Sequence, residues 1–99
     1  MKQQQRLNCV EDLQDLLKQQ KLLQQFSLSR LGVFGSFARN EAAQDIDLFI
    51  EDDVSLETAL QFKQRLEQVV DNRLDVMLKK WANPIVLHRA MKDMRYVEK

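Results

Sequence analysis

The residues best suited to chemistry are a set of aspartates and a Gly-Ser pair. Asp45 and Asp47 lie two residues apart in an apolar stretch that is typical of a β-strand. Because side chains alternate between the two faces of a strand, both carboxylates are expected to point the same way. Two anionic groups held side by side repel each other unless a cation lies between them. The pair therefore indicates a cation-binding face.

Asp75 lies in another strand-like stretch further along the chain. A parallel crossover connection would place this stretch beside the one that carries Asp45 and Asp47, so that all three carboxylates project from one face of a sheet. Three carboxylates without a matching basic cluster form a hard-oxygen site suited to Mg²⁺, which keeps bound waters and shares substrate phosphates. The sequence thus predicts a magnesium site made of these three aspartates.

Gly35 and Ser36 follow the apolar stretch 30–34, where a short helical turn over 37–41 is predicted to begin. Free backbone N–H groups and a hydroxyl at the start of such a turn can bind phosphate oxygens. Gly35 has no side chain, so a phosphate can approach the backbone closely. Together with the carboxylates, this turn suits phosphoryl or nucleotidyl transfer with two metal ions, one activating the attacking hydroxyl and one holding the triphosphate.

Seven elements are predicted to position these residues, in the order α-β-(short α)-β-α-β-α. The apolar periodicity indicates strands over 30–34, 45–50 and 73–78 and helices over 10–26, 56–70 and 84–96. Leu56 and Leu60 are assigned to the buried face of the second long helix. The helical connection makes the second and third strands parallel, whereas the short connection before them favours an antiparallel pair. We therefore predict an α+β fold with a small mixed β-sheet and helices packed mainly on one face.

The length of 99 residues predicts one domain over 1–99, with a polar segment at 1–9 that is either frayed or the start of a helix. No apolar run approaches the roughly 20 residues of a membrane span, and no signal-peptide core follows the polar start. The single cysteine, Cys9, cannot form an internal disulfide, which fits a reducing compartment. A cytoplasmic location without membrane association is the resulting expectation.

Charges are segregated along the chain although they sum to zero. Residues 1–39 carry six bases and three acids, residues 40–72 two bases and nine acids, and residues 73–99 seven bases and three acids. The zero total argues against direct nucleic-acid binding, and Trp81 and Tyr96 are accordingly interpreted as packing or partner contacts. The acidic middle is where a divalent cation is expected. The basic segments either face phosphates or an acidic partner, or are solvated helix faces.

The combination of these motifs resembles a known family. Gly35-Ser36, followed after eight residues by Asp45-Ile46-Asp47 and later by Leu74-Asp75-Val76, is similar to the nucleotidyltransferase superfamily that includes DNA polymerase beta. The string Phe34-Gly35-Ser36-Phe37-Ala38-Arg39 resembles the minimal nucleotidyltransferase (MNT) branch more closely. The resemblance covers most of the chain.

The resemblance implies a role for each site residue. Gly35 and Ser36 would bind the nucleotide phosphates. Asp45 and Asp47 would ligate both of two Mg²⁺ ions, and Asp75 would ligate the catalytic metal and help to deprotonate the acceptor hydroxyl.

The resemblance also implies a partner. MNT proteins that resemble this chain are often antitoxins paired with a helical HEPN ribonuclease toxin, and some modify a tyrosine of that toxin with AMP from ATP. The expected activity is therefore Mg²⁺-dependent transfer of AMP from ATP to a hydroxyl of a HEPN-type partner. Self-association into a homo-oligomer stays open.

Two features depart from the family pattern. The interval between Ser36 and Asp45 is about two residues shorter than is usual for this branch, and Asn40 stands where a glycine is common, although Asn tolerates a left-handed backbone. A shorter loop could misplace the Gly-Ser turn relative to the carboxylates. The alternative hypothesis is therefore a catalytically degenerate MNT domain that neutralises a toxin by binding and masking it.

Some residues keep a structural interpretation beside the functional one. Arg39 could contact a phosphate or form a surface salt bridge with Glu41 or Asp45. Asp75 could pair with Arg73 rather than bind a metal.

Overall fold

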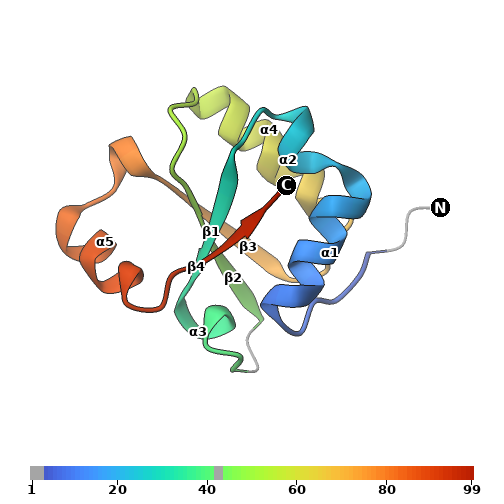
Figure 1. Ribbon diagram of the computed structural model, residues 1–99, viewed down its shortest axis with the longest axis horizontal. Coiled ribbons are helices and arrows are strands. Elements are labelled where there is room, and N and C mark those ends of the chain that lie inside the picture. Colours follow the sequence, from blue (N-terminus) through green and yellow to red (C-terminus); the bar gives the residue numbers. More distant parts are fainter. Residues whose placement is uncertain (1–3, 42–43) are drawn as a thin grey trace.

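A four-stranded β-sheet forms the centre of the molecule in the computed structural model, which describes residues 4–41 and 44–99 (Figure 1). The strands lie in the order β3-β2-β1-β4. They are β1 (Arg30–Phe34), β2 (Asp45–Ile50), β3 (Arg73–Leu78) and β4 (Arg95–Glu98). The helices are α1 (Val10–Gln20), α2 (Leu22–Gln25), α3 (Gly35–Ala38), α4 (Leu56–Glu67) and α5 (Pro84–Met91), with a 3₁₀ turn η1 (Lys79–Trp81).

The sheet is mixed, because β1 pairs antiparallel with β2 and β4, whereas β2 and β3 are parallel. Residues 35–44 connect β1 to β2 and are too few for a crossover, which needs a dozen or more. The helix α4 provides the crossover that makes β2 and β3 parallel. Both pairings agree with the prediction from connection lengths.

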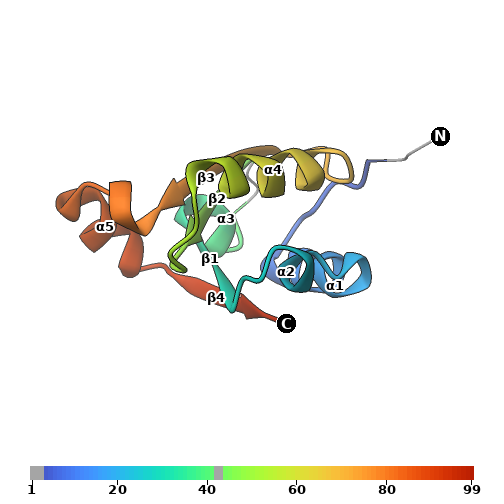
Figure 2. The same ribbon diagram turned by 90° about the horizontal axis from the view of Figure 1, so that it is seen from above.

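The helices α1, α2 and α4 cover one face of the sheet (Figures 1 and 2). Their buried side chains meet the inward-facing residues of the strands in one apolar core, to which the sheet contributes Leu31, Val33, Ile46, Leu48 and Ile50. This layering confirms the predicted fold class and leaves the opposite face of the central strands free of these helices.

The first two long helices each differ from their prediction. The predicted helix over 10–26 is broken at Lys21, which takes a left-handed backbone conformation with a φ of 53°. In α4 it is Phe62 that is buried, whereas Leu56 and Leu60 are exposed, because Leu60 is out of phase with the inward face and Leu56 lies in the first turn. No helix within the described residues is long and apolar enough to cross a membrane.

The end of the chain differs most from the prediction. The helix predicted over 84–96 ends at Met91, and β4 follows it, so that the sheet has four strands rather than three. Tyr96 pairs with Gly32 of β1, and Val97 is buried in the core. The aromatic and β-branched side chains favour a strand once the edge of β1 is available for pairing, and this long-range pairing outweighs the local helical periodicity.

The start of the chain, for which the sequence predicts either a frayed segment or the start of a helix, is held against the rest of the fold. The N–H of Gln5 donates to the carbonyl of Val69 at 2.8 Å. The buried Asn72 accepts a hydrogen bond from the N–H of Leu7 at 2.8 Å and donates one to the carbonyl of Leu7 at 3.0 Å. The part of the segment 1–9 that the structure describes is therefore fixed by specific contacts; residues 1–3 lie outside it.

Candidate functional site

The three predicted aspartates project from the face of the sheet opposite α1, α2 and α4. Asp47 of β2 is paired in register with Asp75 of β3, so their side chains are neighbours on one face. Asp45 lies two residues before Asp47 and shares this face, while Ile46 and Leu48 are buried in the core. The parallel pairing of β2 with β3 brings the three carboxylates together, as the sequence predicts.

The three carboxylates repel one another. Burial, and then the negative charges of Asp75 and Asp45, raise the pKa of Asp47 above its ordinary value of 3.8. Arg73, the alternative partner considered for Asp75, lies instead with its Nε 3.9 Å from a carboxylate oxygen of Asp45. Both members of this ion pair are exposed, so it contributes little. The aspartate face is therefore only weakly neutralised by the described side chains and favours a cation.

Gly35 lies directly against one of these carboxylates. Its φ of 73° is in the left-handed region that glycine adopts without strain. A methyl group added at Gly35 would lie 2.5 Å from Oδ2 of Asp47, so no side chain fits there. The cause is the antiparallel register, in which Phe34 is opposite Asp47. The Gly-Ser turn and the carboxylates therefore meet, although residues 42–43 of the connector lie outside the described residues.

The start of α3 has no side-chain cap. The residue that precedes α3, Phe34, supplies no side-chain acceptor, so the first N–H groups of α3 have no partner of this kind. After α3, Asn40 has a φ of 62° and so takes the left-handed conformation that explains why glycine is common at this position. The departure from the family pattern at Asn40 is therefore accommodated by the backbone.

Arg39 connects the turn to the end of α5. Its Nη2 donates to Oγ of Ser36 at 3.3 Å, its Nε to Glu41 at 2.6 Å and its Nη1 to Asp93 at 2.8 Å. The carboxylates of Glu41 and Asp93 raise the pKa of the Arg39 guanidinium. The salt bridge with Glu41 was one of the alternatives, whereas Asp45 pairs with another residue. Sequence reasoning missed Asp93, because it assigned this stretch to a continuing helix.

No three carboxylate, imidazole or thiol groups among the described residues are arranged so that they could hold a metal ion as they stand. The donor chemistry nevertheless fits Mg²⁺, which binds through one or two carboxylates and completes its shell with waters and phosphate oxygens. Asp47 and Asp75 are adjacent in register, and the charge of Asp75 contributes to the raised pKa of Asp47. This adjacent pair, and not a preformed cage, supports a cation here.

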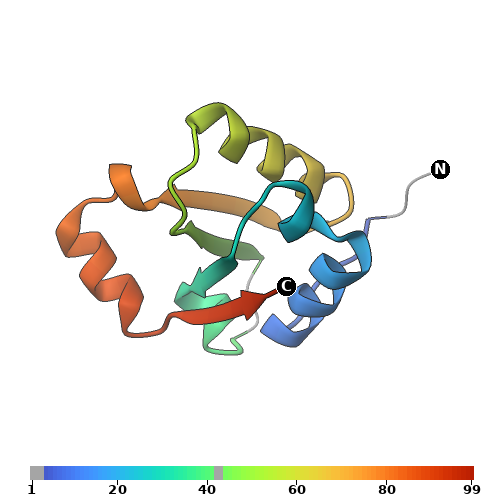
Figure 3. The same cartoon turned by 45° about the horizontal axis from the view of Figure 1, so that its top comes forward.

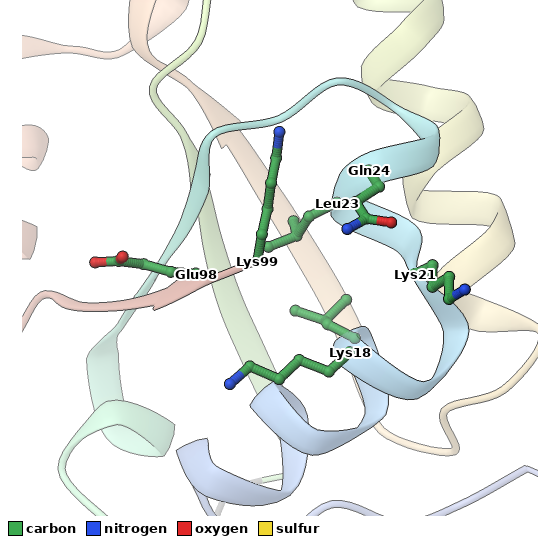
Figure 4. Close-up of a pocket in the computed structure, with 7 residues that line it drawn as sticks. Lys18, Lys21, Leu23, Gln24, Glu98 and Lys99 are labelled. Atoms are coloured by element: carbon green, nitrogen blue, oxygen red, sulfur yellow. The ribbon is translucent and has the colours of Figure 1, made fainter.

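A small pocket between α1, α2 and the end of β4 lies on the helix-covered side of the sheet (Figure 4). Leu17 and Leu23 form its apolar part, and Lys18, Glu98 and Lys99 are among its polar residues. None of the predicted site residues lines it. The aspartate face remains the candidate site because it unites the carboxylates with the Gly-Ser turn.

A family model described as polymerase beta, nucleotidyltransferase matches residues 11–97. The matched span contains the Gly-Ser turn and all three aspartates. A protein adenylyltransferase, MntA, from Thermococcus cleftensis is 28% identical over 94 residues, which cover 89% of this chain and 95% of that protein.

Solved structures share the fold. A chain from a tyrosine-to-alanine mutant of the MntA–HpeT toxin–antitoxin has a TM-score of 0.66 and 20% identity, with 80% of this chain and 68% of that chain covered. A chain from the tri-AMPylated Shewanella oneidensis HEPN toxin in complex with its MNT antitoxin has a TM-score of 0.62 and 21% identity, with 85% and 71% covered. At these identities the two likenesses show a common architecture.

Proposed function

The chain belongs to the polymerase beta nucleotidyltransferase family and is of the MNT type, and from this premise we propose that it transfers AMP from ATP to a hydroxyl of a partner protein. The observation that carries the proposal is the contact of Gly35 with Asp47, beside Asp75. A triphosphate bound at the Gly-Ser turn would lie next to these carboxylates. The name of the Thermococcus cleftensis relative, a protein adenylyltransferase, supports ATP as the nucleotide.

Gly35, Ser36 and Arg39 hold the triphosphate in this proposal. Gly35 lets a phosphate oxygen approach the backbone at a position where any side chain would collide with Asp47. The hydroxyl of Ser36 donates to a phosphate oxygen, and the guanidinium of Arg39, which lies 3.3 Å from that hydroxyl, adds a positive charge.

Asp45, Asp47 and Asp75 are the residues that would hold Mg²⁺, which when bound neutralises the phosphates and lowers the pKa of the acceptor hydroxyl. In the transfer, the acceptor oxygen forms a bond to the α-phosphorus of ATP. The bond from that phosphorus to its bridging oxygen breaks, and pyrophosphate leaves with the electron pair. The exposed carboxylate of Asp75 accepts the proton of the acceptor hydroxyl.

A HEPN-type helical toxin is the partner that we propose, with this chain as its antitoxin. The similar solved structure combines an MNT antitoxin with a HEPN toxin that carries AMP groups. That pairing supports both the class of the acceptor and AMP as the transferred group.

The test is to incubate the protein with Mg²⁺, ATP labelled at the α-phosphate, and the HEPN-type protein expected from the neighbouring reading frame. We expect label on the partner, and about a hundredfold less with the double variant Asp45→Asn/Asp47→Asn, because metal binding and phosphate positioning are both lost. Asp15→Asn is the matched control, because Asp15 is an exposed carboxylate on α1, which covers the sheet face opposite the aspartate face.

Absence of label with the wild type, or equal labelling by the double variant, would rule out the proposed transfer. If the wild type transfers no label and the double variant still neutralises the toxin, the masking alternative is correct.

A further inference from the structure

Four of the six large apolar side chains that are exposed among the described residues lie on η1 and α5. Trp81 is 70% exposed, Ile85 67% and Val86 50%, and Met91 is also exposed. We call Trp81, Ile85 and Val86 the α5 surface; Met91 lies roughly 120–140° around the helix from Ile85 and Val86 and faces another side. Figure 3 shows α5 standing apart from the helices that cover the sheet, attached through the ends of β3 and β4.

Few side chains of the helix α5 are buried against the rest of the fold. Only Ala90 of its eight residues is buried, and no α5 residue belongs to the apolar core. Its start is well formed, because the side chain of Asn83 accepts from the N–H of Ile85 at 2.9 Å and Pro84 takes the first position. Most helical stability comes from packing of an apolar face. A short helix with its apolar residues in water therefore marks a surface that is covered in a complex.

The segment that carries the α5 surface is basic, and we call its Lys and Arg residues the basic rim. Arg89 follows Ile85 and Val86 by four and three residues on the helix, whereas Lys79 and Lys80 also line a pocket with Glu51, Asp52 and Asp53. The segment 79–92 carries Lys79, Lys80, Arg89 and Lys92 and no acidic residue. Of these four, only Lys80 forms an ion pair within the described residues. An apolar centre bordered by positive charge is complementary to an apolar contact bordered by Asp or Glu.

We infer that the α5 surface binds an amphipathic, acidic helix of a partner protein. The apolar face of that helix packs on Ile85 and Val86, and its acidic residues face the basic rim. A groove lined by Leu56, Met77 and Trp81, among others, adjoins the surface and can receive a ridge of side chains from the bound helix.

Two other occupants fit the surface less well. A second copy of this chain would bring two basic rims together in a symmetric contact, which is repulsive. An anionic lipid surface would attract the rim but repel the acidic segment 40–72, which carries nine acids against two bases.

The α5 surface adjoins the candidate active site at two points. Met77, which lines the groove, lies two residues after Asp75 on the same face of β3. Asp93 follows α5 and bonds to Arg39, which also bonds to Ser36. The inference rests on the proposed function in one respect: the bound helix is assigned to the protein that supplies the acceptor hydroxyl.

The binding test uses the ¹⁵N-labelled protein and a synthetic three-heptad peptide with Leu at the a and d positions and Glu at the others. We expect shifts concentrated in the Trp81 indole and the amides of 85–92, and weaker binding at high salt. Val86→Glu should weaken binding about tenfold or more. Leu60→Glu is the matched control, because Leu60 is 49% exposed, as Val86 is 50%, and does not line the groove.

Three results would overturn the inference. Equal binding of a peptide with Lys in place of Glu would show that charge is not recognised. Binding of phosphatidylglycerol vesicles at 85–92 without binding of the acidic peptide would assign the surface to a membrane. A dimer in sedimentation that Val86→Glu dissociates would assign it to a second copy.

The transfer assay separates this inference from the proposed function. Val86→Glu is expected to bind ATP as the wild type does but to label the partner about tenfold less at limiting partner concentration. Asp47→Asn is expected to bind the partner without labelling it. If Val86→Glu labels the partner at the wild-type rate, the docking surface is wrong and the proposed function stands. If the wild type labels nothing while the acidic peptide still binds at α5, the proposed function is wrong and the docking surface stands.

Discussion

Replacing Asp47 with Asn should make the protein more stable, because the carboxylate of Asp47 lies beside other negative charges on the aspartate face. Burial and the charges of Asp75 and Asp45 raise the pKa of Asp47. Asn has nearly the same shape and no charge, so the substitution removes the repulsion without leaving a cavity. Residues that bind a ligand are often retained at such a cost in stability.

The magnitude follows from the strand pairing. Asp47 and Asp75 are opposite each other on neighbouring strands, which lie about 4.8 Å apart. Two unit charges about 5 Å apart repel by about 0.8 kcal/mol in water and about 3 kcal/mol at an effective dielectric constant of 20. Because Asp75 is exposed, the value lies near the lower end. We expect a gain of about 1 kcal/mol at pH 7, equivalent to a rise in Tm of about 4–8 °C.

The pH dependence has a definite sign. A pKa that is raised in the folded protein means that protonation favours folding, so the carboxylate of Asp47 begins to destabilise the wild type as the pH rises above 3.8 and does so fully above the raised pKa. The advantage of Asp47→Asn should therefore be full at neutral pH and shrink as the pH falls through the raised pKa. It should vanish below the ordinary value of 3.8, where the carboxyl is neutral in both states.

The assay is urea denaturation of the wild type and Asp47→Asn from pH 7 downward, without divalent cations. Asp53→Asn is the control, because its carboxylate is exposed and outside the aspartate face, and it should stay within about 0.5 kcal/mol of the wild type. Adding Mg²⁺ at ten times its Kd should stabilise the wild type by about 1.4 kcal/mol and the variant less. A variant that is less stable than the wild type at pH 7 would refute the reasoning.

Three further predictions concern stability. Gly35→Ala should lower the free energy of unfolding by at least about 1–2 kcal/mol and abolish ATP binding, because the φ of 73° strains any side chain and the methyl group would collide with Asp47. Urea denaturation measures the first effect and calorimetric titration with ATP the second. Wild-type affinity for ATP would contradict the proposed role of the turn. Asn72→Ala should lower the free energy of unfolding by about 2–3 kcal/mol in urea denaturation, because it leaves the N–H and C=O of Leu7 buried without partners. A loss below about 0.5 kcal/mol would mean that water replaces the side chain. Asn83→Ala should raise amide exchange in α5 by an amount equivalent to about 1 kcal/mol while leaving the core unchanged, because it removes the helix cap, and unchanged exchange would show that the cap is dispensable.

The aspartate face could be predicted from the sequence because two simple rules fix it. Alternation along β2 places Asp45 and Asp47 on one side, and a helical crossover makes the next strand parallel. With β3 in register beside β2, Asp75 reaches the same face. These features depend on local pattern and chain connection, both of which the sequence contains.

The end of the chain could not be predicted by the same means. Residues 84–96 continue an apolar periodicity that favours a helix, and only the open edge of β1 makes a strand at 95–98 more favourable. The contact of Asp93 with Arg39 and the exposure of α5 both follow from where that strand begins. Such pairings between distant segments are set by the whole fold and leave little local signal.

The short connector between Ser36 and Asp45 is a weaker argument against activity than it seems from the sequence. The antiparallel register places Phe34 opposite Asp47, so Gly35 emerges beside that carboxylate whatever the length of the loop that follows. The connector has only to lead from Ala38 to Asp45, and its six intervening residues can span up to about 20 Å when extended. The position of the Gly-Ser turn is thus set by the register of β1 with β2. Changing that register should impair ATP binding, whereas inserting two residues after Asn40 should leave it intact.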